Sequence, residues 1–416
     1  MENLYIKNFL VIKEAELEVK KINVIIGSQG TGKSVIVKAL YFFQEIGSIF
    51  RKCLTQENSL DKVYKGIKEK FIEIFPEYAW KNQNFEIVYT KNDIKIDISN
   101  LNNDFQTKLS GKLASDYNIS LLKFLDVKNE LDSSQINDNE LFKFPKHFLY
   151  KRAATKILEE SSINQIISSP TFIPATRAFF SLFQENLFSF INTAQQNLDP
   201  FIRDFGQMYE GYRGFYNKNK EKIYNNFPIQ FIQEIMKGEI IEKDNQLYIL
   251  DKNNREIALA QASSGQQEAL PMLLTLSVLS FFSETKKDLI YIEEPEAHLF
   301  PISQALTIKI LSYLYGKDLN FILTTHSPYV LSEFNNYLYA GSLIKRNLLT
   351  QNDFQEILPN TTAIHSNNLS AYKIENGYLT SIIDHEFDII DSNEIDKASE
   401  HSQDIFSKLL AFEKEI

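Results

Sequence analysis

The chain has 416 residues, of which 44% are hydrophobic, and a formal net charge of −10 at pH 7. This length and apolar content predict a large core and more than one domain, or one domain with a large insertion. The negative charge excludes nonspecific coating of nucleic acid by the whole surface, because phosphate binding depends on clustered Lys and Arg. Cys53 is the single cysteine, which excludes an internal disulfide and a cysteine-based metal cage.

Membrane and export signals are missing from the sequence. No apolar run approaches the about 18 residues of a membrane span, and the first residues lack the basic, apolar and small-residue order of a signal peptide. We therefore expect a cytoplasmic protein with no membrane partner.

The first motif is a glycine-rich loop between a predicted strand, residues 22–26, and a predicted helix that starts near Ser34. Its sequence, GSQGTGKS, matches a P-loop in pattern and context, so we expect it to bind a nucleoside triphosphate. The glycines let backbone amides surround phosphate oxygens, Lys33 reaches the β and γ phosphates, and the Ser34 hydroxyl ligates Mg²⁺. The predicted nucleotide contacts are Gly27, Ser28, Gln29, Gly30, Thr31, Gly32, Lys33, Ser34 and Val35.

Two segments of the long middle region have clear periodicity. Residues 85–98 alternate apolar and polar around KND, which predicts a β-hairpin that extends a β-layer begun by residues 3–18. Apolar residues from Leu187 to Phe215 keep a 4-3 spacing, which predicts two amphipathic helices in a compact helical subdomain. Asp199 and Pro200 are expected to start the second of these helices as N-cap and first-turn proline.

The densest basic stretch is residues 143–156, with aromatic residues interleaved. Two interpretations stay open. The stretch can follow a nucleic-acid backbone, or it is a solvated helix face, which is the commoner role of a charge run.

The segment QASSGQQEALPMLLTLSVL begins a long apolar helix. Ser264 and Gln267 have capping-box spacing, so Ser264 and Gly265 are expected at a helix amino terminus, which favours anions. Ordinary capping also explains the serine, but it does not explain the glycine that follows.

Residues 288–292 predict a central parallel strand that ends in two adjacent acids. Neighbouring side chains on a strand point to opposite sides, so Glu293 and Glu294 need not collide. We assign Glu293 to the Mg²⁺ shell, directly or through water, and Glu294 to the orientation of the attacking water. The alternative is a solvated acidic turn.

A second apolar strand, residues 321–323, leads into Thr324, Thr325 and His326. A histidine at a strand end can donate to a γ-phosphate, although a structural role is commoner for a lone histidine. The predicted catalytic residues are therefore Glu294, His326 and Lys33. The tail, residues 391–412, predicts a closing amphipathic helix, and its acids lack the pattern of a TOPRIM nuclease.

In chain order, GSQGTGKS, SSGQQE, YIEEPEAHLF and TTHSP resemble the Walker A, signature, Walker B with D-loop, and switch-histidine motifs of ABC-class ATPases. The EEPEAHL version resembles the SMC, RecF and OLD-like branch rather than transporter cassettes. The resemblance implies an α/β fold, namely an ABC-type P-loop ATPase head with a mixed sheet, an antiparallel β-layer and a compact helical insertion. It also implies ATP and Mg²⁺ as cofactors.

The resemblance divides the chain into four segments. They are a head N-lobe with Walker A at 1–49, an insertion with the hairpin and helical arm at 50–224, a head C-lobe with the other motifs at 225–345, and a C-terminal strand and helix extension at 346–416.

The same resemblance implies a composite site, because in this family the signature of one subunit closes over ATP bound to another. Ser264, Gly265 and Gln266 would then act in trans within a homodimer or a higher homo-oligomer. The segment FIPATR, residues 172–177, takes the place of a loop that senses Mg²⁺, but it lacks the usual glutamine. Arg177 either touches nucleotide or a partner, or is a surface arginine whose stem packs on the core.

The chain most resembles the stand-alone ATPases of bacterial anti-phage systems such as Septu, PARIS and retron-associated modules. These act with a separately encoded effector, so the resemblance implies an ATP-dependent association that regulates a nuclease or toxin partner. One alternative is a RecF-like or SMC-like repair ATPase that binds DNA. Another is an assembly scaffold that binds ATP without turning it over.

Overall fold

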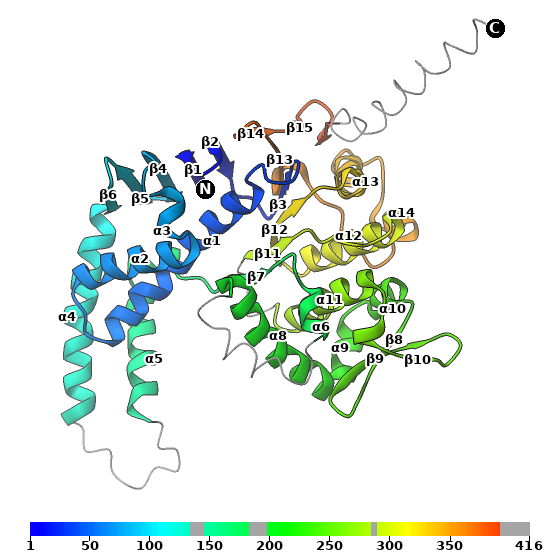
Figure 1. Cartoon of the computed structure of the whole chain (residues 1–416), viewed down its shortest axis with the longest axis horizontal. Coiled ribbons are helices and arrows are strands. Elements are labelled where there is room, and N and C mark those ends of the chain that lie inside the picture. Colours follow the sequence, from blue (N-terminus) through cyan, green and yellow to red (C-terminus); the bar gives the residue numbers. More distant parts are fainter. Residues whose placement is uncertain (134–144, 183–197, 284–288, 392–416) are drawn as a thin grey trace, which may run out of the picture. The chain divides into compact units, whose positions relative to one another are not determined.

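The computed structural model describes residues 1–133, 145–182, 198–283 and 289–391 (Figure 1). The predicted closing helix of the tail lies outside these residues. The chain forms two compact units. The first comprises residues 1–19, 30–170 and 375–379, and the second comprises residues 20–29, 171–374 and those from 380 onward. The boundaries of these two units differ from those of the four segments predicted from the motifs. The four segments stay a prediction.

The first unit is built on an antiparallel β-layer with strand order β6-β5-β4-β1-β2. β4 and β5 form the predicted hairpin, and β4 also pairs with β1 in a register that places Ile6 opposite Ile87. The prediction that the hairpin extends the N-terminal layer is therefore confirmed. The strands are β1 (Glu2–Phe9), β2 (Ile12–Glu18), β4 (Phe85–Lys91), β5 (Ile94–Leu101) and β6 (Asp104–Leu109), with β14 (Tyr378–Ser381) joined to β2 through Tyr378 and Glu14.

Helices of the first unit pack around α1, which begins inside the P-loop. They are α1 (Lys33–Thr55), α2 (Leu60–Ile74), α3 (Glu77–Trp80), α4 (Gly111–Ser133), α5 (Lys146–Glu159) and the short η1 (Ser162–Ile166). α4 and α5 lie side by side (Figure 1). α4 buries Leu113, Tyr117 and Phe124, and α5 buries Ala154 and Leu158, at spacings of four and seven residues that place them on one face of each helix.

The second unit contains parallel strands in the order β13-β3-β12-β11-β7. Every residue of β11 is buried, which agrees with a central strand covered on both faces. The parallel strands are β3 (Ile22–Ile26), β7 (Thr171–Ile173), β11 (Leu289–Glu293), β12 (Asn320–Thr325) and β13 (Leu369–Glu375). Two small antiparallel sheets join β8 (Gly238–Lys243), β9 (Gln246–Asp251) and β10 (Glu256–Ala258), and β15 (Ile383–Asp384) with β16 (Ile389–Ile390).

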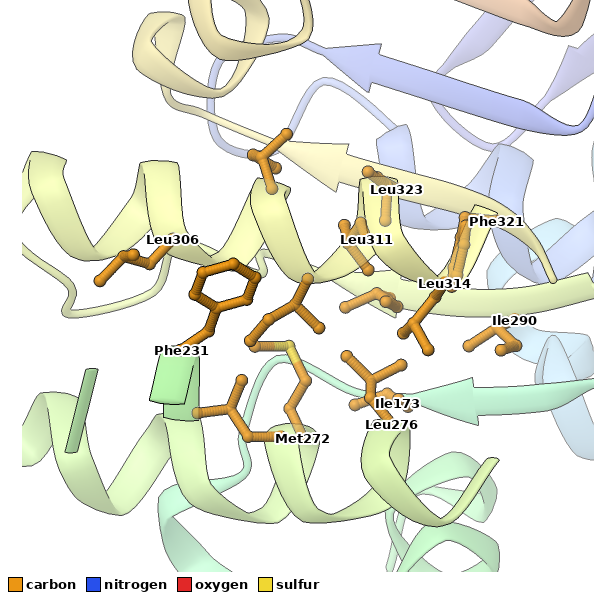
Figure 2. Close-up of a cluster of buried hydrophobic side chains, with 14 of the residues drawn as sticks. Ile173, Phe231, Met272, Leu276, Ile290, Leu306, Leu311, Leu314, Phe321 and Leu323 are labelled. Atoms are coloured by element: carbon orange, nitrogen blue, oxygen red, sulfur yellow. The ribbon is translucent and has the colours of Figure 1, made fainter. Parts of the chain in front are cut away.

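Helices cover these parallel strands and form the core shown in Figure 2. Ile290 and Phe321 of the strands lie in the same buried cluster as Met272 of α11 and Leu311 of α12. The helices of this unit are α6 (Ala178–Leu182), α8 (Pro200–Lys218), α9 (Lys220–Asn226), α10 (Ile229–Met236), α11 (Ser264–Phe281), α12 (Pro301–Gly316), α13 (Pro328–Lys345) and α14 (Gln351–Ile357), with the short η2 (Leu259–Gln261) and η3 (Ser366–Asn368). Parallel strands here and antiparallel strands in the first unit confirm the mixed α/β class. None of the helices in the described ranges is long and apolar enough to cross a membrane.

The helical arm differs from the prediction. Residues 183–197, which hold the first half of the 187–215 stripe, lie outside the described part of the chain. The second half is α8, and Asp199 caps it as predicted by accepting a hydrogen bond from the Phe201 N–H at 2.8 Å. However, α8 packs on α11 and buries Phe205 and Tyr209 in the core of the second unit. It therefore belongs to the unit with the parallel strands rather than to a separate helical subdomain.

The aromatic cluster of the first unit leads to a stability prediction. The Phe71 ring lies 5.5 Å from the Trp80 ring and 5.3 Å from the Phe42 ring. We expect Phe71→Ala to lower the free energy of unfolding by about 3–5 kcal/mol, because it leaves a cavity among rings that cannot close it. Denaturant unfolding followed by fluorescence measures this directly, since Trp80 is the single tryptophan. The control is Tyr78→Ala, where the side chain is 89% exposed, and an equal loss in both variants would contradict the packing.

Candidate nucleotide site

The P-loop backbone has the geometry that its glycines predict. Gly30 and Gly32 have φ angles of 76° and 105°, a region that favours glycine. A Cβ at Gly30 would meet nothing within 4 Å, so the requirement there is conformational rather than steric. α1 starts at Lys33, and the Val35 N–H donates to the Gly32 carbonyl at 3.0 Å. The loop therefore continues directly into a helix amino terminus, which can bind phosphate.

The two predicted acids end β11 and differ in their surroundings. Glu293 is 8% exposed, and its Oε1 atom is buried with no hydrogen-bond partner among the described residues. A buried, unpaired carboxylate oxygen is costly unless a cation meets it. The described residues contain no cluster of three or more His, Cys, Asp or Glu that could hold a metal. Mg²⁺ in a phosphate site needs only one or two protein oxygens beside phosphates and waters, so the buried Glu293 Oε1 atom fits such an ion.

Glu294 and His326 come together, as the assignment of both to one reaction requires. The His326 Nε2 atom lies 3.0 Å from the Glu294 Oε1 atom, and both side chains are about one-third exposed, at 34% and 37%. Parallel pairing explains this, because Glu293 of β11 lies opposite Thr324 of β12 and the two strands end at one edge. The Glu294 N–H also donates to the Thr324 carbonyl at 2.9 Å.

Glu296 has a role that the sequence did not reveal. It is 8% exposed, and its Oε1 atom accepts hydrogen bonds from the Thr325 hydroxyl and the His326 N–H, both at 2.7 Å. The Thr325 hydroxyl in turn accepts from the Ser327 N–H at 3.0 Å. Glu296 thus holds the backbone that carries His326. Its position as the third acid of EEPE was visible in the sequence. Its hydrogen-bond partners, however, lie 29 and 30 residues later in the chain.

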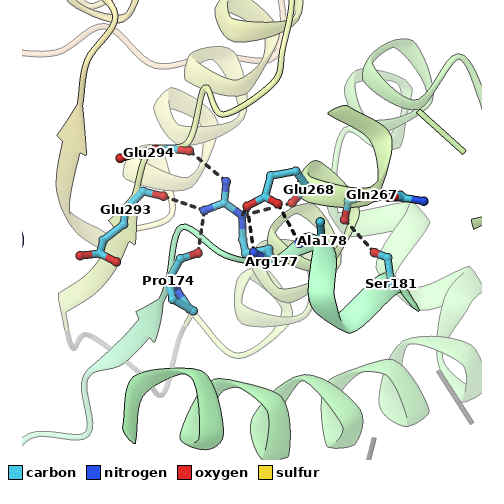
Figure 3. A network of polar contacts seen from close by, with 8 residues as sticks. All are labelled: Pro174, Arg177, Ala178, Ser181, Gln267, Glu268, Glu293 and Glu294. Carbon is cyan, nitrogen blue, oxygen red and sulfur yellow. Dashed lines mark hydrogen bonds and ion pairs between the residues drawn. The ribbon is translucent and has the colours of Figure 1, made fainter. Parts of the chain in front are cut away.

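Arg177 is the second residue whose role sequence reasoning missed. The prediction of a surface arginine is wrong, because its side chain is 0% exposed. The guanidinium group donates to the carbonyls of Pro174, Glu293 and Glu294, and Figure 3 shows these contacts. The Glu268 carboxylate lies beside it, with 3.7 Å between Nε and Oε1. Burial lowers the pKa of Arg177, and the charge of Glu268 opposes that shift. The Arg177 side chain nevertheless stays protonated, because a guanidinium group does not lose its proton in proteins.

The amino terminus of α11 differs by one residue from the prediction. The capping box joins Ser263 and Gln266, not Ser264 and Gln267, and Ser264 is the first helical residue. The Gln266 side chain also donates to the Met236 carbonyl at 2.6 Å. Gly265 allows a close approach, because a Cβ there would lie 2.6 Å from the His298 carbonyl oxygen. The trans roles of Ser264, Gly265 and Gln266 stay predictions.

Comparison with known proteins identifies the family. The family described as AAA ATPase domain matches residues 1–331, which is most of the chain. The chain belongs to this ATPase family. No curated protein matches the chain.

Three solved structures with distant similarity to this ATPase are SMC or RecF proteins. The SMC head domain from Thermotoga maritima is 14% identical with a TM-score of 0.36, over 91% of this chain and 97% of that one. An Smc head domain from Pyrococcus furiosus with an extended coiled coil, bound to the C-terminal domain of ScpA, is 12% identical with a TM-score of 0.38, over 97% and 100%. The recombination mediator RecF with ATPrS is 15% identical with a TM-score of 0.32, over 91% and 97%.

The hydrogen bonds of Thr325 generate a prediction for the site. We expect Thr325→Val, which keeps the shape of the side chain, to lower the free energy of unfolding by about 1–3 kcal/mol, because the Ser327 N–H loses its acceptor and Glu296 a donor. Chemical denaturation measures the loss. The matched control is Thr324→Val on the same strand, since the Thr324 hydroxyl makes none of these bonds. Equal losses of stability at both positions would contradict the role assigned to the Thr325 hydrogen bonds.

Proposed function

We propose that this AAA ATPase hydrolyses ATP, with the Glu294–His326 pair as the chemical centre. The 3.0 Å contact between these side chains at the ends of β11 and β12 is the observation that supports the proposal most. The Glu294 carboxylate orients the attacking water and accepts its proton, and His326 donates a hydrogen bond to the γ-phosphate. Lys33 contacts the β and γ phosphates. Bound Mg²⁺, held by Ser34 and Glu293, would neutralise charge on the phosphate oxygens.

Glu294→Gln tests the catalytic assignment. We expect ATP turnover to fall by about a hundredfold or more, because an amide cannot accept the proton of the water, while ATP affinity stays close to that of the parent chain. Phosphate release and equilibrium binding of ATP measure the two quantities.

The control for this variant is Glu386→Gln, which changes an exposed glutamate of the same unit in the same way. Unchanged phosphate release in Glu294→Gln would remove Glu294 from its role. Absence of repeated turnover in the parent chain would instead favour the scaffold that uses ATP without hydrolysis.

We further propose that ATP drives association of two or more copies through the signature residues. Ser264 is exposed at the start of α11, and large apolar side chains are exposed at the starts of two other helices of the same unit. They are Phe300 at 73%, Ile302 at 67% and Tyr329 at 57%. In the proposed association these side chains become covered. The resemblance to anti-phage ATPases makes a separately encoded nuclease or toxin the proposed partner of the associated form.

Association can be tested in the Glu294→Gln background, where ATP persists. We expect sedimentation to show an ATP-dependent dimer or larger species, and we expect Ser264→Arg to abolish it while ATP binding by the single chain remains. The added side chain would fill the space that the second copy needs for the γ-phosphate. A monomer at all ATP concentrations in the Glu294→Gln protein would contradict the composite site.

A DNA-binding repair ATPase remains the second candidate, because α5 presents exposed Lys151, Arg152 and Lys156. Lys146 of the same helix instead pairs with Asp132 at 3.0 Å. If DNA binds here, neutralising Lys151 and Arg152 should weaken binding and lower the log–log salt slope by about 1 per lost phosphate contact. The control is Lys146→Gln. A slope that stays the same in the double variant would exclude α5 as the DNA contact.

A further inference from the structure

The geometry points to Arg177 as a positioning residue that holds Glu294 in its working conformation, with Glu268 of the signature helix α11 as its anchor. This inference rests on the proposed role of Glu294 in ATP hydrolysis. It concerns two buried side chains that act through the backbone of Glu293 and Glu294.

The guanidinium group of Arg177 joins three backbone segments (Figure 3). Nη1 donates to the Pro174 carbonyl at 2.9 Å and to the Glu293 carbonyl at 2.6 Å, and Nη2 donates to the Glu294 carbonyl at 2.9 Å. One rigid planar group therefore fixes two consecutive carbonyls, that of Glu293 at the end of β11 and that of Glu294 directly after it. A planar fork of donors restrains orientation as well as distance, which a single ammonium group cannot do.

Glu294 needs such a restraint because its backbone is in the left-handed region, with φ of 46°. A glutamate adopts this conformation only when its surroundings impose it. Its N–H is held by the Thr324 carbonyl at 2.9 Å, and its carbonyl is held by Arg177. The direction of the carboxylate toward His326 depends on that conformation, because the side chain leaves the backbone between these two fixed points.

Glu268 ties the same group to α11. Its two carboxylate oxygens accept hydrogen bonds from the backbone N–H groups of Arg177 and Ala178, at 2.8 and 2.7 Å. Its backbone carbonyl accepts a hydrogen bond from the Nε atom of the Arg177 side chain at 3.1 Å. Glu268 is 4% exposed and follows Ser264 by one helical turn. A movement of the start of α11 therefore reaches the Glu294 carbonyl through two buried side chains. Engagement of the signature residues and alignment of the catalytic carboxylate are joined by this path.

The burial of Arg177 argues against a packing role alone. Enclosing a charged pair costs desolvation free energy, and apolar residues of similar volume often stabilise a fold at least as well. Here the side-chain donors go to backbone carbonyls, and two of those carbonyls belong to the catalytic acids. The arrangement is explained if the orientation of those peptide groups matters for the reaction.

Arg177→Lys tests the inference, since it keeps the charge and removes the fork. We expect kcat to fall by about 10- to 100-fold, as a small displacement of a catalytic group does, while KM for ATP changes by less than about threefold. The matched control is Arg213→Lys, which changes another buried arginine of the same unit, 8% exposed and in contact with Asn245 and Glu242. We expect kcat of this control to stay within about twofold of the parent value.

The decisive measurement combines Arg177→Lys with Glu294→Gln under single-turnover conditions. If Arg177 acts through the Glu294 carboxylate, its substitution has no further effect once that carboxylate is gone. A merely structural arginine would lower the residual rate by the same factor in both backgrounds, and that additive result would overturn the inference. So would an unchanged kcat in Arg177→Lys alone.

Glu268→Gln keeps the test valid if Arg177→Lys does not fold. The amide introduced at this position retains one acceptor oxygen and leaves the Ala178 N–H poorly matched, which weakens the anchor of Arg177. We therefore expect kcat to fall by about tenfold in Glu268→Gln alone. In the Glu294→Gln background we expect Glu268→Gln to have no further effect on the residual rate. Failure of the proposed function is recognised separately, because Glu294→Gln by itself would then leave phosphate release unchanged. If Glu294→Gln blocks turnover and the folded Glu268→Gln protein retains the parent kcat, only the positioning role is overturned.

Discussion

The parallel pairing of β7, β11 and β12 is the constraint on which the chemistry of the second unit depends. Ile292 of β11 lies opposite Ile173 of β7 and opposite Leu323 of β12. Because the three strands run in the same direction and in this register, the segments that follow them all leave the sheet at the same edge. The polar residues that follow them are therefore brought together whatever their distance in sequence. The buried apolar strands determine where this edge lies. Glu293, Glu294, His326 and Arg177 are close together because each lies at or near the end of one of these strands.

Charge is unusually concentrated beneath that edge. Arg177, Glu268, Glu293 and Glu296 are all less than one-tenth exposed. Hydrogen bonds offset most of the desolvation cost, since Arg177 binds carbonyls and Glu268 and Glu296 accept N–H or hydroxyl groups. Glu293 Oε1 and Glu296 Oε2 are the buried carboxylate oxygens of this group without such a partner in the described part of the chain. Proteins retain arrangements of this cost where function requires them.

The site also shows how a strained backbone can be maintained. Glu294 and His298, both in the loop after β11, have left-handed φ angles of 46° and 58°. Arg177 holds the carbonyl of Glu294, and Gly265 of α11 leaves room for the carbonyl of His298. One contact comes from α11 itself, and the other comes from Arg177, which Glu268 of α11 holds. The loop that carries Glu294 and His298 is thus shaped partly by its contacts with Arg177 and with α11.

The sequence by itself determined the local elements. The P-loop, the 85–98 hairpin and the buried strands before Glu293 and His326 are each encoded within a few residues, by glycine conformation, by alternation and by apolar runs. The sequence also indicated that Asp199 caps a helix, because a cap depends on its immediate neighbours. Family membership rests on a match over residues 1–331, which contain all of these elements.

Only the tertiary structure decided which distant groups meet. Arg177 is 91 residues from Glu268 and 116 from Glu293, and no local pattern specifies such a pair. The same holds for α8, whose apolar stripe predicted a helix but not that α11 would be its partner. The cap of α11 fell on Ser263 because two adjacent serines offer equivalent local chemistry and Gln266 reaches only one of them while it binds Met236. Periodicity shows that a face is buried, whereas the partner of that face depends on how the whole chain packs.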